Sequence, residues 1–153
     1  MSYNRDSDEA LGSKKLSVYG DKSKQDGTVQ VSELIGEALD WAVAQCEGLP
    51  VVYDPMGFRS GTEAGYWVWD DSPQGKMSKI GRQYSPSTNW AQGGDIIERV
   101  QISLACPSPI ETNWCAMTWR CKAKQEGSTA LVAAMRCYVQ MKMGTTIKIP
   151  STI

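Results

Sequence analysis

The segment from Tyr84 to Arg99 gathers residue types that bind small anionic ligands such as nucleotides. It reads YSPSTNWAQGGDIIER and crowds hydroxyls, amides and an indole into sixteen positions. An aromatic ring can stack on a base, arginine pairs with phosphate, and exposed backbone N–H groups can cradle an anion. The predicted ligand-binding residues are Tyr84, Ser87, Thr88, Asn89, Trp90, Gln92, Gly93, Gly94 and Arg99, with Trp67, Trp69 and Arg136 as secondary candidates.

Local spacing supports this interpretation and also offers a structural alternative. Asp95 and Glu98 have the spacing of a capping box, which predicts that a helix begins there and that Gly93 and Gly94 precede it in a loop. Backbone N–H groups at such a loop suit anions. The alternative is a self-hydrogen-bonded turn with Trp90 inserted into the core. Both interpretations stay open at the level of sequence.

Catalytic chemistry is constrained by the absence of histidine. The chain contains none, which excludes Ser-His-Asp and Cys-His catalysis and histidine-ligated zinc. Asp95 and Glu98 could form an acid–base pair, and Asp54, Asp70 and Asp71 could hold a divalent cation. A capping box for the first pair and turn-forming aspartates for the others are the favoured interpretations, because each gives the carboxylates a local structural role. We therefore expect no catalytic residues, no metal site and no cofactor, and a carboxylate-based hydrolase is the least favoured alternative.

The five cysteines show no CxxC pair, so a zinc ribbon or a thioredoxin-like motif is absent. On one straight strand, Cys115 and Cys121 would lie roughly 20 Å apart, too far for a disulfide. We expect reduced thiols that behave as small buried hydrophobic groups.

Charge and hydropathy exclude some classes of binding partner. Sixteen basic and seventeen acidic residues give a net charge of −1, which argues against a nucleic-acid partner because proteins that coat nucleic acid usually carry a basic excess. No apolar run is long enough to span a bilayer, and the polar N-terminus has no signal-peptide core. These features predict no membrane partner and a cytoplasmic location.

The elements that would position the segment suggest an α+β fold. Residues 1–27 form a polar extension that we expect to be mobile, and residues 28–153 form a single α+β domain. An amphipathic helix is predicted from Ser32, its N-cap, to Gly48, and a second helix over 129–143. Strands are predicted at 51–53, 66–69, 100–106, 114–122 and within 145–153. The expected architecture is an antiparallel sheet of four to six strands with two main helices packed on it.

Two side-chain patterns bear on packing. The helix at 129–143 is apolar on nearly all sides except at Arg136 and Gln140. This predicts either burial within the domain or contact with another chain, as a homo-oligomer through this helix or on a host protein. Among the six tryptophans, Trp41, Trp119 and one of Trp67 or Trp69 are expected to pack inside, whereas Trp90 belongs to the candidate site.

The chain resembles the phage and prophage NinX-like family of small proteins. The resemblance is carried by Val29 to Gly48, by the YSPSTxWxQGGxIIER pattern at 84–99 and by AAMRCYV at 133–139. It covers roughly residues 29–144 and departs from the family in the first 27 residues and in the tryptophan- and cysteine-rich stretch 113–126.

This resemblance implies a phage or prophage origin and action in the cytoplasm of a bacterial host. The residues of the 84–99 segment and the absence of histidine lead us to predict a non-enzymatic binding protein in phage–host conflict, acting in counter-defence. Such a protein would bind a small anionic, nucleotide-like ligand or a host defence protein. The alternative is a protein–protein interaction module that inhibits a host protein.

Overall fold

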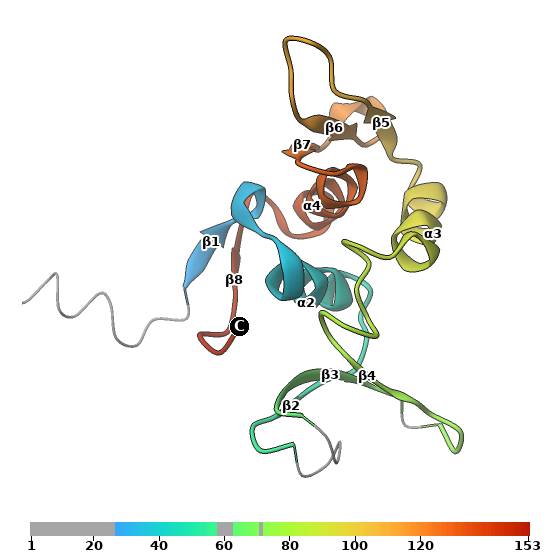
Figure 1. The fold of residues 1–153 in the computed structure, drawn as a ribbon, viewed down its shortest axis with the longest axis vertical. Helices are drawn as coiled ribbons and strands as arrows, with labels where there is room; N and C mark the ends of the chain where they lie inside the picture. The colour runs from blue at the N-terminus through green and yellow to red at the C-terminus, as the bar shows by residue number, and fades with distance from the viewer. Residues whose placement is uncertain (1–26, 58–62, 71) are drawn as a thin grey trace, which may run out of the picture.

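A computed structural model describes residues 27–57, 63–70 and 72–153 (Figure 1). The predicted polar extension therefore lies outside the described residues except for Gly27. The helices are η1 (Val31–Glu33), α2 (Gly36–Cys46), α3 (Trp90–Val100), η2 (Trp119–Cys121) and α4 (Ala130–Met143), of which η1 and η2 are single 3₁₀ turns. The strands are β1 (Thr28–Gln30), β2 (Val51–Asp54), β3 (Gly65–Trp69), β4 (Met77–Lys79), β5 (Ser103–Ala105), β6 (Trp114–Met117), β7 (Lys124–Gly127) and β8 (Thr146–Lys148).

The fold is α+β, as predicted, but the predicted single sheet is wrong. Within the described residues the strands form three small antiparallel sheets, ordered β1-β8, β2-β3-β4 and β5-β6-β7. Each strand is three to five residues long. Helices α2, α3 and α4 lie between these sheets and separate them (Figure 1). The predicted edge strand in the C-terminal tail is confirmed as β8, which pairs with β1 through Val29 and Ile147.

Helix α4 forms the centre of the core. Its residues from Ala130 to Met135 and from Cys137 to Val139 are all buried. Helices α2 and α3 and the strands β6 and β7 pack around it (Figure 1). Thr129 caps its first turn by accepting a hydrogen bond from the backbone N–H of Val132 at 3.2 Å. Packing within the chain thus accounts for the apolar character that suggested a partner for this helix.

Helix α2 ends as predicted, but its N-cap is Ile35, three residues after the predicted Ser32. Gly48 adopts φ +68°, the left-handed conformation that commonly follows a helix and favours glycine. At the other end, Ser32 does not cap the helix because residues 31–33 form η1 and Leu34 is extended. A 3₁₀ turn places positions three apart on one side, so Val31 and Leu34 are both buried. Burial of this pair therefore determines where α2 begins.

Two predicted strands are shorter than expected. The stretch 100–106 contains only β5, because α3 extends to Val100 and Gln101 takes a left-handed conformation with φ 60°. The stretch 114–122 turns back on itself after β6, at Arg120 with φ 62°, and β7 follows antiparallel. Trp119 lies at this turn and is 65% exposed, so the prediction that it packs inside is wrong.

The turn also separates Cys115 from Cys121, which lie on β6 and η2 rather than on one strand. Cys46, Cys106, Cys115 and Cys137 are free thiols. Burial raises the pKa of Cys46 to about 12 and that of Cys137 to about 11, which makes both thiols poor nucleophiles. Cys106 is exposed, so the prediction of burial fails for that residue.

The β2-β3-β4 sheet is joined to α2 by an aromatic contact and an ion pair. The rings of Trp41 and Tyr66 meet edge to face with centroids 6.3 Å apart. Lys79 is buried and its Nζ lies 3.1 Å from the carboxylate of Glu37. Trp41 is half-buried and packs against the core, in line with its predicted packing role.

Candidate functional site

The segment 84–99 is mostly helical, and the predicted capping box is wrong. The side chain of Asn89 accepts a hydrogen bond from the backbone N–H of Ala91 at 2.9 Å, so Asn89 is the N-cap of α3 and Trp90 is its first residue. Asp95 and Glu98 therefore lie in the middle of the helix, and both are exposed. The backbone N–H of Gly93 donates to the carbonyl of Asn89 at 2.8 Å, so it is not available to an anion as predicted.

Close packing requires the first of the two glycines but not the second. A Cβ at Gly93 would lie 2.3 Å from the carbonyl oxygen of Pro86 and 2.6 Å from the Leu131 side chain. Gly93 is therefore required for the close approach of α3 to its preceding loop and to α4. A Cβ at Gly94 would meet only the Trp90 ring, at 3.8 Å.

The loop before α3 is held by hydrogen bonds within the chain. The backbone N–H of Ser87 donates to the Asp40 carboxylate at 2.8 Å, and both residues are buried. Burial raises the pKa of Asp40 to about 6, and the hydrogen bond from Ser87 partly offsets this effect. The Gln92 amide bridges the loop by accepting from Ser85 N–H at 2.7 Å and donating to the carbonyl of Gln83 at 2.6 Å.

Arg99 is compensated by an acidic partner. It donates to both carboxylate oxygens of Glu47, at 2.9 and 2.8 Å, and the hydroxyl of Tyr138 donates to the same carboxylate. Burial alone would raise the pKa of Glu47, but the hydrogen bonds from Tyr138 and Arg99 outweigh it and lower the pKa. This cluster joins the end of α2 to α3 and α4.

The predicted ligand-binding residues of 84–99 do not line a single cavity, because they are divided between two. Tyr84 and Gln92 line a cavity of about 340 Å³ whose walls also include the acidic Glu47 and Asp95. Thr88, Ser87 and Trp90 line another of about 240 Å³, together with the first turn of α4. Arg99 lines neither.

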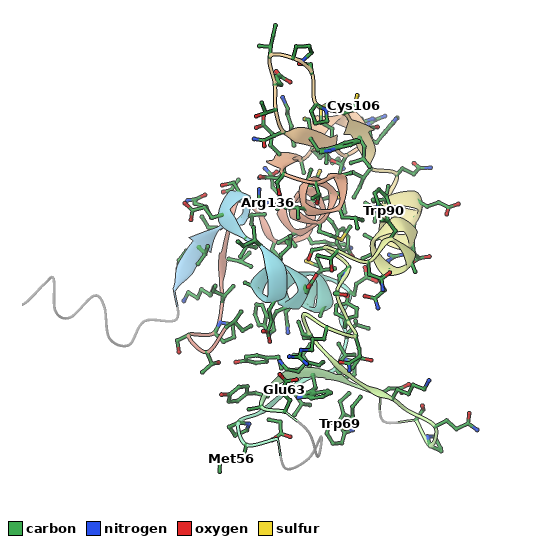
Figure 2. All side chains as sticks on the ribbon, in the orientation of Figure 1. Met56, Glu63, Trp69, Trp90, Cys106 and Arg136 are labelled. Atoms are coloured by element: carbon green, nitrogen blue, oxygen red, sulfur yellow. The ribbon has the colours of Figure 1, made fainter. Side chains whose placement is uncertain are left out.

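Trp90 is 58% exposed, so the alternative that places it in the core is wrong. The other tryptophan candidates lie elsewhere. Trp67 is buried on β3 and its indole N–H donates to the carbonyl of Glu63 at 3.2 Å, which is a packing role. Trp69 is half-buried on the same strand, away from both Trp90 and Arg136 (Figure 2).

The secondary candidate Arg136 lines a cavity of about 630 Å³ between η1, β7 and the middle of α4. Its Nε donates to the carbonyl of Leu34 and its Nη1 to the carbonyl of Glu126, both at 2.8 Å. Figure 2 shows Arg136 on the side of α4 that faces η1, with Trp90 on the other side. The walls consist of Ser32, Asn113, Lys124, Gln125, Glu126, Gly127, Ser128 and Arg136.

A carboxylate neutralises the charge of Arg99, but none forms an ion pair with Arg136 among the described residues. In the part of the chain that the structure describes, no carboxylate forms an ion pair with Arg136 or with Lys124. Burial lowers the pKa of Arg136 from its ordinary value, but a guanidinium remains charged at neutral pH. Three of its five N–H donors are unused by the two backbone carbonyls. Sequence reasoning identified Arg136 but not its cavity neighbours, which come from segments far apart in the chain.

The two carboxylates considered as an acid–base pair, Asp95 and Glu98, are exposed on α3. Asp95 lies 3.7 Å from the Arg99 guanidinium, one helical turn away on the exposed surface of α3. Among the described residues, no three His, Cys, Asp or Glu side chains could hold a metal ion together. Asp71 lies outside the described residues. None of the helices in the described ranges reaches the length and hydropathy of a bilayer span.

Comparison with protein families matches residues 30–142 to the family described as Bacteriophage P22, NinX. No curated protein matches the chain significantly. The match includes α2, the loop and helix of 84–100 and nearly all of α4, and so contains the Arg99–Glu47 pair and Arg136. It covers about three quarters of the sequence, and it confirms the resemblance found from the motifs. The chain therefore belongs to the bacteriophage P22 NinX family.

Proposed function

We propose that this phage-family protein binds a small anionic ligand, without transforming it, in the cavity around Arg136. The observation that carries the proposal is the half-buried Arg136 guanidinium, which has no acidic partner among the described residues and faces an open polar cavity. A partly desolvated arginine pairs strongly with carboxylate or phosphate because its planar N–H groups form charge-assisted hydrogen bonds. Lys124 adds a second positive charge to the same wall.

The proposal places the ligand at a secondary candidate instead of the 84–99 segment. In that segment, Asn89 caps a helix, Gln92 bridges the preceding loop and Arg99 is paired with Glu47. The cavity that includes Tyr84 also contains two carboxylates, which would repel an anion. The remaining polar groups of the segment thus offer an anion less than the Arg136 cavity does.

Family membership supports a role inside an infected bacterium. A binding protein made by a phage can act in the host cytoplasm by removing an anionic metabolite or signal on which host defence depends. We propose counter-defence by such sequestration. The absence of histidine from the chain is consistent with binding rather than general acid–base chemistry.

Isothermal titration calorimetry with ribose 5-phosphate, AMP and citrate tests the binding step. We expect a measurable affinity for at least one of them, and a loss of about tenfold or more in Lys124→Gln and Arg136→Gln. Lys148→Gln is the matched control, because Lys148 is an exposed strand lysine away from the cavity. Thermal unfolding of each variant shows whether it remains folded, which matters because Arg136 also bonds two backbone carbonyls.

Absence of binding at millimolar concentration, or equal affinity in wild-type protein and in folded Lys124→Gln, would overturn the proposal. Weakening in Lys124→Gln but not in Lys148→Gln supports it even if Arg136→Gln fails to fold.

A second candidate function is a module that binds and inhibits a host protein. It is favoured by Trp90, whose exposed ring borders the small cavity lined by Leu131 and Val132. Exposed tryptophans beside apolar pockets are frequent energetic centres of protein interfaces. Affinity capture from host cells would test it with wild-type protein, Trp90→Ala and Trp69→Ala. A partner retained by Trp69→Ala and lost by Trp90→Ala is the expected result, and equal capture by both variants would contradict it.

A further inference from the structure

The geometry points to a phosphorylated polyhydroxyl compound, such as a sugar phosphate, as the ligand of the Arg136 cavity. This inference rests on the proposed function and adds the chemical class of the ligand. The cavity would recognise hydroxyl groups as well as phosphate, and it would not require an aromatic base.

The first argument is the chemistry of the walls. None of the eight lining residues carries an aromatic ring, whereas base recognition usually depends on stacking against one. The exposed Trp90 ring borders a different cavity, on the other side of α4 (Figure 2). A nucleotide held by Arg136 would therefore gain little from its base.

The second argument is the charge pattern along β7. Successive side chains of a strand alternate between its faces, so Lys124 and Glu126 lie on one face and both are exposed. Gln125 and Gly127 face α4, where the Gln125 amide donates to Gln140 at 3.0 Å and Gly127 meets the backbone of Ala133. Lys124 and Glu126 nevertheless line the cavity together with Arg136, whose Nη1 donates to the backbone carbonyl of Glu126, so the lining residues include two cations and one carboxylate.

This pattern suits a ligand that has an anion at one end and hydrogen-bond donors at the other. A bare phosphate would be attracted by Arg136 but repelled by Glu126. A hydroxyl group donates a hydrogen bond to a carboxylate, so Glu126 becomes an attractive partner when the ligand carries hydroxyls. The charges of the lining residues sum to +1, which still favours an anion.

The third argument is size and polar capacity. A volume of about 630 Å³ is within the range of cavities that hold organic ligands and is far larger than one phosphate requires. Ser32 and Ser128 contribute hydroxyls, and Asn113 contributes an amide that can donate and accept. These groups can bind several hydroxyls of one compound.

Calorimetry with four probes and two variants tests the inference. For wild-type protein we expect ribose 5-phosphate and AMP to bind within about threefold of each other. Inorganic phosphate should bind about tenfold more weakly, and ribose should show no heat of binding. Glu126→Gln should weaken ribose 5-phosphate and strengthen inorganic phosphate, because it removes both the hydroxyl acceptor and the repulsion. Glu98→Gln, on the exposed surface of α3, is the matched control and should change neither affinity.

The outcomes separate the two proposals. Binding of AMP at least tenfold more tightly than ribose 5-phosphate would overturn the sugar phosphate but leave anion binding intact. The same holds if Glu126→Gln shifts both probes in one direction. Absence of binding by all three phosphate-containing probes would overturn the proposed function and this inference together.

Discussion

Arg99 donates two hydrogen bonds to the carboxylate of Glu47, at 2.9 and 2.8 Å, across 52 positions of sequence. Tyr138 donates to the same carboxylate from α4. The last residue of the family's central motif thus connects three helices. The arginine that looked most suitable for a phosphate already has an anionic partner inside the fold.

Replacing Arg99 should reduce stability and leave ligand binding unchanged. Arg99→Ala leaves Glu47 with only Tyr138 as a donor, so we expect the free energy of unfolding to fall by about 1 kcal/mol, since the arginine is half exposed. Urea unfolding measures this change. Arg82→Ala is the control, because Arg82 pairs with Glu63 at an exposed site and should lose less than about 0.5 kcal/mol. A loss of ribose 5-phosphate binding in folded Arg99→Ala would return the site to the 84–99 segment.

Asp40 should make stability depend on pH. Its pKa is raised to about 6 in the folded protein and is near 3.8 when exposed, so the folded state binds the proton more tightly. Its stabilising contribution is therefore complete below about pH 4 and is lost as the pH rises through 6. Asp40→Asn keeps an acceptor for the Ser87 N–H but cannot ionise. Urea unfolding at each pH gives the free energy of unfolding of both proteins. Relative to wild type, the free energy of unfolding of Asp40→Asn should increase between pH 4 and pH 7. Parallel pH profiles of the two proteins would refute this prediction.

The two glycines of α3 should respond in opposite directions. Gly93→Ala inserts a methyl group 2.3 Å from the Pro86 carbonyl and should destabilise the protein by about 2 kcal/mol or more. Gly94→Ala meets only the Trp90 ring at 3.8 Å and should stabilise α3 by about 0.5 to 1 kcal/mol, because alanine favours helix. Thermal unfolding of both variants checks the pair. An unchanged melting temperature in Gly93→Ala would contradict the close packing of Gly93 against Pro86 and Leu131.

Trp67 and Trp90 should differ in their contribution to stability. Trp67→Ala empties a buried site on β3 and should cost about 3 to 5 kcal/mol. Trp90→Ala removes a ring that is 58% exposed, and we expect a change of about 1 kcal/mol or less. Acrylamide quenches the fluorescence of exposed tryptophans most strongly. The strongly quenched fraction of the emission should therefore decrease in Trp90→Ala and in Trp119→Ala, since both rings are exposed. A large loss of stability in Trp90→Ala would assign the ring a packing role after all.

Elements with strong local signals were predictable. The apolar residues of 129–143 predict α4, and the structure confirms it. Gly48 likewise marks the end of α2. The start of α3 was not predictable from the same rules, because two consecutive glycines favour a loop. The close contact of Gly93 with Pro86 and Leu131 overrides that preference, because only glycine fits at this position of the helix.

The sequence by itself determined the family, the α+β class and the absence of histidine chemistry, because these depend on residue identity and local pattern. It also identified Arg99 and Arg136 as candidate anion ligands. Only the tertiary structure decided between them. Arg99 forms an ion pair with a carboxylate at the end of α2, whereas Arg136 donates to two backbone carbonyls, one of them 102 positions away, and forms no ion pair among the described residues. Electrostatic partners are chosen by proximity in space, which local spacing along the chain does not encode.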